Sequence, residues 1–277
     1  MNLIPQSGNP MRRLFLLAPP GQLPFRFREV AADADLHADA LARVQQFRGG
    51  VYVEEGNLTP EDLSSDGRHV QATDAKSWHL FTMNGRNEVE ACGRLLPHPE
   101  NVGYRDLGVA HSSLAESKEW GPVLREAVEE EIRIARHRGV RFVEFGGWAV
   151  SRRLRCTTEA VRMCLAWYAL CRAIGGTIGL GTANTGYHSS AILRRIGGRP
   201  LAKTGQPIPR YYEPRYRAEL EILCFDSAEP NPRYAAQIEQ CVHALSAVTV
   251  ITAEEKLSAK KIAWNFASPV PVYASAY

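Results

Sequence analysis

The chain lacks the cysteine and histidine spacings that build metal centres and disulfide frameworks. Its 277 residues include six cysteines, and no two of them form a C-x-x-C pair. No His and Cys cluster has metal-ligand spacing, and no Ser, His and Asp arrangement indicates a catalytic triad. We therefore expect no bound metal, and we interpret the cysteines as buried thiols in a reducing compartment.

Long apolar runs are also missing. No segment approaches the roughly 20 apolar residues that a membrane-spanning helix needs. Met11–Pro20 (MRRLFLLAPP) resembles the start of a signal peptide, but its apolar stretch is too short and prolines interrupt it. The formal net charge is only +3, so bulk charge does not indicate nucleic-acid binding. These absences predict a cytoplasmic protein with no integral membrane association and no nucleic-acid partner.

The most informative stretch that is present runs from Val140 to Arg172. Val140–Val150 is almost continuously apolar, as is typical of a strand covered on both faces. From Thr157 or Thr158 onward, apolar residues recur with helical spacing. The turn between them carries three arginines, Arg152, Arg153 and Arg155. Because a helix N-terminus favours anions, the stretch predicts a phosphate-binding strand–turn–helix.

The remaining segments alternate between strand and helix patterns. Strands are expected at 24–30, 77–83, 88–96, 176–182 and 216–225. Helices are expected at 35–47, 120–138, 189–196 and 231–245. Gly49-Gly50 is expected to end the first helix. This order indicates a mixed α/β fold with one sheet that has antiparallel and parallel parts.

No linker is long enough to divide the chain into two independent domains. We predict a loosely ordered arm over residues 1–24, because five prolines lie there among Gly, Gln and Ser. One domain is expected over 25–227. A C-terminal helix and an irregular tail are expected over 228–277.

Four short motifs carry a family resemblance. They are Arg48-x-x-Val51-Tyr52-Val53-Glu54-Glu55, Asp74-x-x-Ser77-Trp78-His79-Leu80, Gly93-Arg94-Leu95-Leu96-Pro97 and Glu144-Phe145-Gly146-Gly147-Trp148-Ala149-Val150. Together they resemble the GNAT acyltransferase superfamily, and within it the N-acyl amino acid synthases and the related acyl-homoserine-lactone synthases. The resemblance implies a mostly antiparallel central sheet flanked by helices, with a splayed central pair of parallel strands.

Three departures from the family pattern are informative. The lactone synthases carry an arginine where this chain has Gly147, which argues against homoserine-lactone chemistry. The acetyl-CoA turn R-x-x-G-x-G/A has no glycines here, so its backbone cannot wrap a pyrophosphate as closely. The superfamily's tyrosine acid aligns with Leu193, so that acid is absent or supplied elsewhere.

The resemblance implies an N-acyltransferase. It would move a medium or long acyl chain from acyl carrier protein, its partner, to the α-amine of an amino acid substrate. No cofactor would be bound permanently, because the donor is a phosphopantetheine thioester on acyl carrier protein, or acyl-CoA. Two alternatives stay open: an acyl-CoA-dependent N-acyltransferase or autoinducer-type synthase, and a catalytically silent module that binds acyl carrier protein or a lipid.

Glu144 and Arg94 are the candidate catalytic residues that the resemblance implies. Glu144 would act as the base or position the amine, and the alternative is a strand carboxylate paired with an arginine. Arg94 would bind the acceptor carboxylate in a bidentate manner or orient Glu144, and the alternative is a structural salt bridge.

The other candidates form two groups. The first would bind the phosphopantetheine or the carrier protein, and consists of Val150, Arg152, Arg153, Arg155, Thr157 and Thr158. The second would border the acceptor or acyl pocket, and consists of Arg48, Tyr52, Phe145, Trp148 and His188. A core role is an equal or stronger explanation for Arg48 and for the aromatic members, and a surface position is the alternative for His188. His79 is the other histidine of interest.

Overall fold

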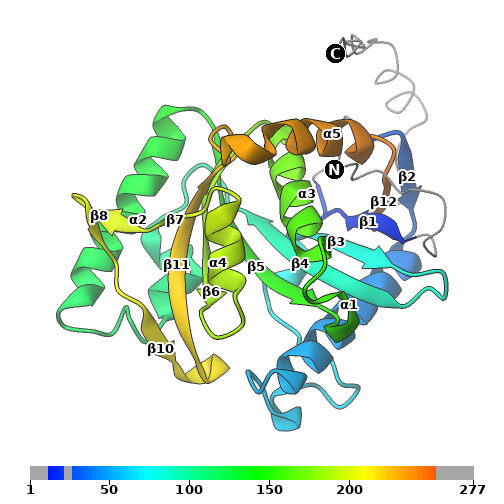
Figure 1. Cartoon of the computed structure of the whole chain (residues 1–277), viewed down its shortest axis with the longest axis horizontal. Coiled ribbons are helices and arrows are strands. Elements are labelled where there is room, and N and C mark those ends of the chain that lie inside the picture. Colours follow the sequence, from blue (N-terminus) through cyan, green and yellow to red (C-terminus); the bar gives the residue numbers. More distant parts are fainter. Residues whose placement is uncertain (1–11, 22–26, 254–277) are drawn as a thin grey trace.

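The computed structural model describes residues 12–21 and 27–253. They form an α/β fold in which one ten-stranded sheet crosses the molecule and helices flank it (Figure 1). Two short strands, β8 (Ala202–Lys203) and β9 (Gln206–Pro207), form a second sheet. The ten strands are β1 (Arg13–Leu17), β2 (Glu29–Ala32), β3 (Trp78–Met83), β4 (Val89–Pro97), β5 (Arg141–Val150), β6 (Thr177–Asn184), β7 (Arg199–Pro200), β10 (Tyr211–Glu213), β11 (Ala218–Asp226) and β12 (Thr249–Thr252).

The helices cover both faces of the sheet. Successive strand residues point to opposite faces. On β5, Val143 packs in the cluster that contains α3 (Glu159–Ala173) and α5 (Ala235–Leu245), whereas Phe142 packs in the cluster that contains α2 (Trp120–His137). A third cluster lies beneath α1. The helices are α1 (Ala34–Glu54), α2 (Trp120–His137), α3 (Glu159–Ala173), α4 (Ser189–Arg195) and α5 (Ala235–Leu245). None of the described helices is long and apolar enough to span a membrane.

The strands follow the order β10-β11-β6-β5-β4-β3-β1-β12-β2, and β7 also pairs with β11. Most neighbours are antiparallel, but β5 and β6 are parallel, as are the pairs β1–β12 and β12–β2. This topology confirms the predicted mixed, mostly antiparallel sheet with a central parallel pair.

The parallel strands β5 and β6 pair along only part of their lengths. On β5 the paired residues run from Arg141 to Phe145. Beyond Phe145, β5 continues beside β4 to Val150, and β6 continues beside β11 to Asn184. The sheet therefore opens between the two strands, as the predicted splay required, and the facing backbone edges there do not pair with each other.

A β-bulge lies in β5 where this opening begins. Gly147 and Trp148 together occupy the place opposite Gly93 of β4, because the register shifts between Cys92 and Arg94. Gly147 has φ of +60°, the left-handed conformation that glycine adopts without strain. The extra residue shifts the alternation of β5, so that Phe145 and Trp148 both pack on the α3 side.

The first helix is longer than predicted. α1 continues through Gly49-Gly50 to Glu54 instead of ending near Phe47. A Cβ on Gly49 would lie 3.0 Å from the carbonyl oxygen of Gly67 and 3.1 Å from the backbone nitrogen of His69. Gly49 therefore serves the close approach of a loop to the helix, and it does not end the helix.

Six strands were not predicted. Four of them, β7 to β10, have only two or three residues each. The other two come from segments that were expected to be irregular. Arg13–Leu17, expected in the loose arm, forms β1 between β3 and β12, and Thr249–Thr252, expected in the irregular tail, forms β12 between β1 and β2. The two strands pair with each other although they lie far apart in the sequence. Neither segment therefore has a local residue pattern that marks it as a strand. The other expected elements form within a few residues of their predicted bounds.

The remaining arm and tail residues, 1–11, 22–26 and 254–277, lie outside the described part of the chain. The first part of the strand expected at 24–30 falls on these residues, and the strand seen in the described part is β2. The division of the chain at residues 24 and 227 stays a prediction.

Candidate active site

Glu144 lies on β5 just before the strands part. Its Oε1 accepts a 2.8 Å hydrogen bond from the backbone N–H of Gly108, and its Oε2 lies 2.9 Å from Nε2 of His98. The side chain of Glu144 is 16% exposed and that of His98 is 7% exposed. The carboxylate is therefore held in one orientation while it still faces a cavity. Such a group can accept a proton from a substrate in that cavity.

His98 reaches Glu144 because of the antiparallel pairing of β4 and β5. Leu96 is opposite Glu144, and the chain continues so that the backbone N–H of His98 donates to the carbonyl of Phe142 at 2.9 Å. His98 therefore lies diagonally across the strand pair from Glu144, within reach of a long side chain.

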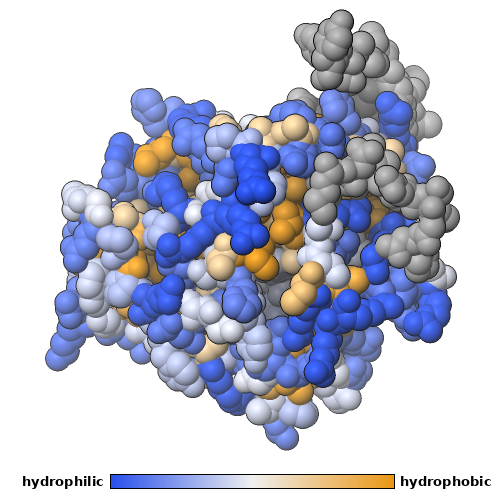
Figure 2. All heavy atoms as spheres, in the orientation of Figure 1, coloured by the Kyte–Doolittle hydropathy of each residue, from blue (hydrophilic) through white to orange (hydrophobic). Residues whose placement is uncertain are grey.

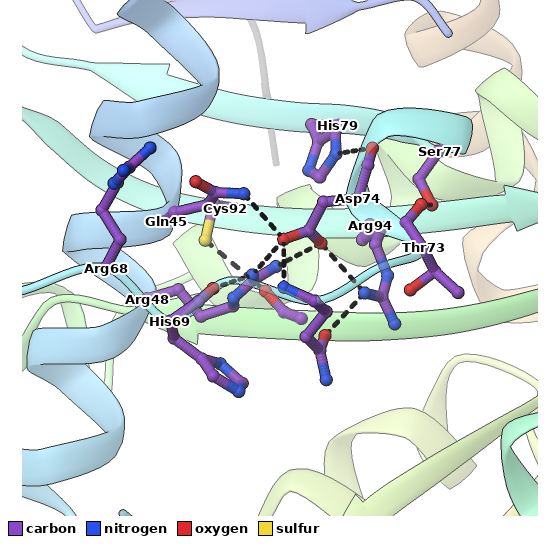
Figure 3. A network of polar contacts seen from close by, with 12 residues as sticks. Gln45, Arg48, Arg68, His69, Thr73, Asp74, Ser77, His79, Cys92 and Arg94 are labelled. Carbon is purple, nitrogen blue, oxygen red and sulfur yellow. Dashed lines mark hydrogen bonds and ion pairs between the residues drawn. The ribbon is translucent and has the colours of Figure 1, made fainter. Parts of the chain in front are cut away.

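A network of charged side chains surrounds Asp74 (Figure 3). Asp74 is at its centre and is 2% exposed. Arg48 donates from Nη1 and Nη2 to the two oxygens of Asp74, at 3.1 and 2.7 Å. Arg94 donates from Nη1 to Asp74 at 3.0 Å and to Oε1 of Gln71 at 2.5 Å. Within the described residues, Arg94 therefore pairs with Asp74 and not with Glu144. Glu144 is held by His98 and by the backbone of Gly108.

Burial and the two arginines act in opposite directions on Asp74. Burial alone would raise the pKa of this carboxyl, but the hydrogen bonds and charges of Arg48 and Arg94 outweigh it and hold the pKa well below the ordinary value. The neighbouring histidines are kept neutral. Burial lowers the pKa of His79 to about 4, and burial followed by the charge of Arg48 lowers the pKa of His69 to about 4.

One cavity of about 470 Å³ joins the two faces of the sheet at the opening between β5 and β6. On the α2 side its lining includes polar side chains, and there Glu144 and Arg94 meet Gln71, Tyr52, Glu213 and Arg215. On the α3 side its lining forms an apolar arm of Phe145, Trp148, Cys164, Trp167, Tyr168 and Phe225. Figure 2 shows hydrophobic residues reaching the surface between α3 and α4, with hydrophilic residues around them.

Gly147 explains how the buried arginines fit beside the cavity. A Cβ on Gly147 would lie 3.0 Å from Nη1 of Arg48 and 3.3 Å from Cβ of Arg94. Because its φ is also positive, an arginine at this position would be strained and crowded. The two arginines from α1 and β4 thus occupy the space that a side chain at position 147 would need.

The arginine turn after β5 is paired with carboxylates that are distant in the sequence. Arg155 lies 3.0 Å from Glu55 and Arg152 lies 3.8 Å from Glu54, both at the end of α1. Arg153 pairs with Glu90, which is 1% exposed and also accepts from Arg12 at 2.6 Å. The remaining predicted donor-site residues are Val150, which ends β5, Thr157, whose hydroxyl donates to the carbonyl of Leu154, and Thr158, which precedes α3.

The cavity brings together some of the predicted site residues and leaves others outside it. Glu144, Arg94, Tyr52, Phe145 and Trp148 line it. Among the described residues that line the cavity, none comes from the predicted donor turn, 150–158. Arg48 is fully buried behind Arg94, and His188 is exposed, with φ of +60° at the start of α4. The roles of all these residues stay predictions. Over the described part of the chain, no group of three or more His, Cys, Asp or Glu residues could hold a metal ion.

No protein-family model matches the sequence, and no curated protein matches it. Among solved structures, the chain is similar to the CoA-dependent acyl-homoserine lactone synthase BjaI with MTA, at a TM-score of 0.54 and 15% identity, over 92% of this chain and 99% of that chain. The chain has the GNAT-like fold. BjaI with SAM and isopentyl-CoA gives a TM-score of 0.53 at 14% identity, with the same coverage. The N-acyl amino acid synthase FeeM from uncultured soil microbes gives 0.46 at 14% identity, over 79% of this chain and 93% of that chain.

Sequence reasoning missed two groups of this site, namely His98 and the backbone N–H of Gly108. His98 directly follows the Gly93–Pro97 motif, so its place at the end of a strand beside Glu144 was a usable signal. Gly108 lies in an irregular segment whose path the sequence does not reveal. The buried carboxylate of Glu213 was missed as well, since β10 has only three residues.

Proposed function

We propose that this chain is an N-acyltransferase. It moves a medium or long acyl chain from the phosphopantetheine thioester of acyl carrier protein to the α-amine of an amino acid. One observation carries the proposal: a single cavity passes through the sheet and connects an apolar arm to a polar end that contains Glu144. An acyl chain fits the first environment, and an amine with its carboxylate fits the second.

The parted strands supply a binding place for the donor. Beyond Phe145 the facing edges of β5 and β6 do not pair with each other, so their backbone groups are available to the amides of a pantetheine arm. An extended arm bound there is held by main-chain hydrogen bonds, as a peptide is held at an open sheet edge. Its thioester then lies at the bulge, between the apolar arm and Glu144.

Glu144 is the proton acceptor in this scheme. The amine nitrogen attacks the thioester carbon while Glu144, directly or through one water, takes the proton that the nitrogen loses. The C–S bond then breaks, the electron pair leaves with the sulfur, and an amide and a thiol result. Gly108 N–H and His98 fix the carboxylate toward the cavity, so the reacting groups meet with little loss of orientation entropy.

Arg94 is the group for the acceptor carboxylate. Its Nη1 bonds Asp74 and Gln71, and its Nη2 lies 3.3 Å from the place of a Cβ on Gly146, beside the face that carries Glu144. Cross-strand neighbours two residues apart lie roughly 7–8 Å from each other at the backbone. An amino acid whose carboxylate binds this guanidinium can therefore present its amine to Glu144.

The donor turn favours acyl carrier protein over CoA. This turn has no glycines that would let its backbone wrap a pyrophosphate. Its Arg155 and Arg153 are paired with Glu55 and Glu90, which leaves Arg152 as its most exposed cation. A single phosphodiester on an acidic carrier needs no pyrophosphate cradle. The alternative donor is acyl-CoA. The likeness of this chain to a CoA-dependent synthase of the same fold supports that alternative.

Mass spectrometry of lipid extracts from bacteria that express the chain tests the proposal. We expect new N-acyl amino acids with the native chain, and a loss of roughly 10²–10⁴-fold in Glu144→Gln, as for removal of a general base. Glu129→Gln is the matched control, because Glu129 is an exposed carboxylate paired with Arg125 on α2. If the native chain forms no acylated amine, in cells or when purified with acyl thioesters of carrier protein and CoA, the proposal is wrong.

A further inference from the structure

A chain of polar side chains lies between the arginine turn and the cavity. Among the described residues that line the cavity, none comes from the turn, 150–158, whereas Glu55, Asn57 and Asn184 do line it. A donor whose phosphate binds at the turn and whose acyl chain lies in the apolar arm has to pass these three side chains. Their contacts therefore bear on how the donor enters.

The contacts run without a break from the turn to β6. Nη2 of Arg155 lies 3.0 Å from Oε1 of Glu55, and Oε2 of Glu55 accepts a 3.1 Å hydrogen bond from Nδ2 of Asn57. Oδ1 of Asn57 in turn accepts from Nδ2 of Asn184 at 2.9 Å. Arg155 lies in the turn after β5, and Asn184 is the last residue of β6. The contacts of these four residues, which we call the latch, therefore cross the opening between the two strands at its outer end.

The latch is anchored on both sides of the opening. Glu55 directly follows α1, and the backbone N–H of Asn57 donates to the carbonyl of Tyr52 in that helix at 2.9 Å. From the other side, Oη of Tyr187, in the loop between β6 and α4, donates a 2.6 Å hydrogen bond to the carbonyl of Glu55. The latch thus joins the end of α1 to the end of β6.

The ion pair at the turn is the weak member of the latch. Nη2 of Arg155 is buried, and among the described residues it has no aligned hydrogen-bond acceptor, although Glu55 lies 3.0 Å away. Burial raises the pKa of Glu55, and the charge of Arg155 opposes that rise. A phosphate can bond a guanidinium in a bidentate manner with good alignment. A phosphodiester that reaches Arg155 can therefore replace Glu55 there.

We propose that Glu55 and Asn57 control the entry of the acyl donor. While Glu55 pairs with Arg155, the bonds from Glu55 through Asn57 to β6 close the outer end of the opening. When the donor phosphodiester binds Arg155, it releases Glu55, and the pantetheine arm takes the place of the latch between the strands. This inference rests on the proposed function, because the donor that opens the latch is the donor of that reaction.

Binding of two unreactive probes tests the latch. The probes are the S-decyl thioethers of pantetheine and of phosphopantetheine, which have no thioester and transfer no acyl group. A ligand that binds only the open form loses affinity in proportion to the fraction that is closed. Calorimetry with the purified chain should therefore show that Glu55→Gln and Asn57→Ala each bind both probes about tenfold more tightly than the native chain does.

Arg155→Gln should separate the two probes. This change removes the anchor of the latch and also the group that receives the phosphate. The unphosphorylated probe should bind more tightly than it does to the native chain. The preference of the native chain for the phosphorylated probe should fall to within about threefold of unity.

Glu54→Gln is the matched control. Glu54 lies 3.7 Å from the same Nη2 of Arg155, but its side chain is 42% exposed and takes no part in the latch. Removal of this carboxylate should leave the binding of the unphosphorylated probe unchanged. Urea midpoints measured on each variant show that it is folded.

Two results would overturn the inference. If Glu55→Gln and Asn57→Ala bind the probes no more tightly than the native chain, these side chains do not obstruct the donor and have a structural role alone. If the gain in Glu55→Gln is confined to the phosphorylated probe and Glu54→Gln shares it, Glu55 acts only through its charge.

The probe measurement does not depend on turnover, so it separates this inference from the proposed function. Tighter binding of both probes by the two variants, without acyl transfer by the native chain, would overturn the transferase and leave the latch standing. Acyl transfer by the native chain, with unchanged probe binding in the two variants, would overturn the latch alone.

Discussion

Two groups of arginines lie near the cavity, and they differ in almost every physical respect. Arg48 and Arg94 are buried around Asp74, with side-chain exposures of 0% and 13%. In the turn after β5, the side chains of Arg152, Arg153 and Arg155 are 84%, 50% and 32% exposed. The second group is prominent in the sequence, because its members are consecutive or nearly so. The first group is assembled only by folding.

The comparison teaches that a cluster of charges in the sequence does not indicate how much those charges contribute to folding stability. Water screens an exposed pair, which contributes little to stability. A buried carboxylate that loses its cation has nowhere to place its charge. The network around Asp74 should therefore control stability, whereas Arg152, the most exposed arginine of the turn, should control encounter with an acidic donor.

Arg48→Met should have the largest effect. It leaves Asp74 short of its main partner in a buried site, so we expect the free energy of unfolding to fall by about 3–5 kcal/mol. Urea denaturation measures this. Arg43→Met, on an exposed face of the same helix where Arg43 pairs with Asp39, should cost at most about 0.5 kcal/mol. Similar losses in the two variants would remove the distinction between the two groups.

The pH dependence of stability should be the next largest effect. The pKa of His79 is about 4 in the folded chain and about 6.5 when the chain is unfolded. As the pH falls from about 6.5 to 4, the unfolded chain takes up a proton that the folded chain refuses. Stability should therefore fall across this window, by up to about 3 kcal/mol from this one group.

His79→Gln should make that pH profile shallower, although His69 still contributes its own lowered pKa. Urea midpoints measured from pH 7 to pH 4 give the slope. His137→Gln, at an exposed position at the end of α2, should keep the native slope. An unchanged slope in His79→Gln would show that the buried histidine does not resist protonation.

Arg152→Ala should have the smallest effect on the fold. Its side chain is 84% exposed, so the urea midpoint should not change. The KM for an acyl-carrier donor should rise about threefold at low salt, and the difference should shrink at high salt. Arg86→Ala, on the β3–β4 hairpin, removes an equally exposed arginine and should leave KM unchanged. A clear loss of stability in Arg152→Ala would contradict the comparison.

Elements with strong local periodicity could be predicted from the sequence. The hairpin of β3 and β4, the amphipathic helix α2 and the succession of β5 and α3 all formed where periodicity placed them. The glycine pair in α1 was misinterpreted because a glycine that permits close packing resembles one that ends a helix. Pairing over long distances in the chain, as in β1 and β12, leaves no local pattern.

The site could be predicted only in part. The motifs pointed to Glu144 and Arg94, which line the same cavity. They did not reveal that His98 orients Glu144, because the register of β4 against β5 depends on a bulge. The carboxylates that pair with the arginine turn were also invisible, since Glu54, Glu55 and Glu90 come from other elements.

The position of β12 sets an order for assembly during synthesis. Among the described strands, β2 pairs with β12 alone, and Glu29 faces Thr249 in their register. A ribosome adds about 5–20 residues per second, so roughly 10–40 seconds pass between synthesis of these two partners. During that time β2 is an unpaired strand on a nascent chain. Chaperones that shield open strand edges should therefore raise the yield of this protein by protecting Glu29–Ala32 until Thr249–Thr252 is made.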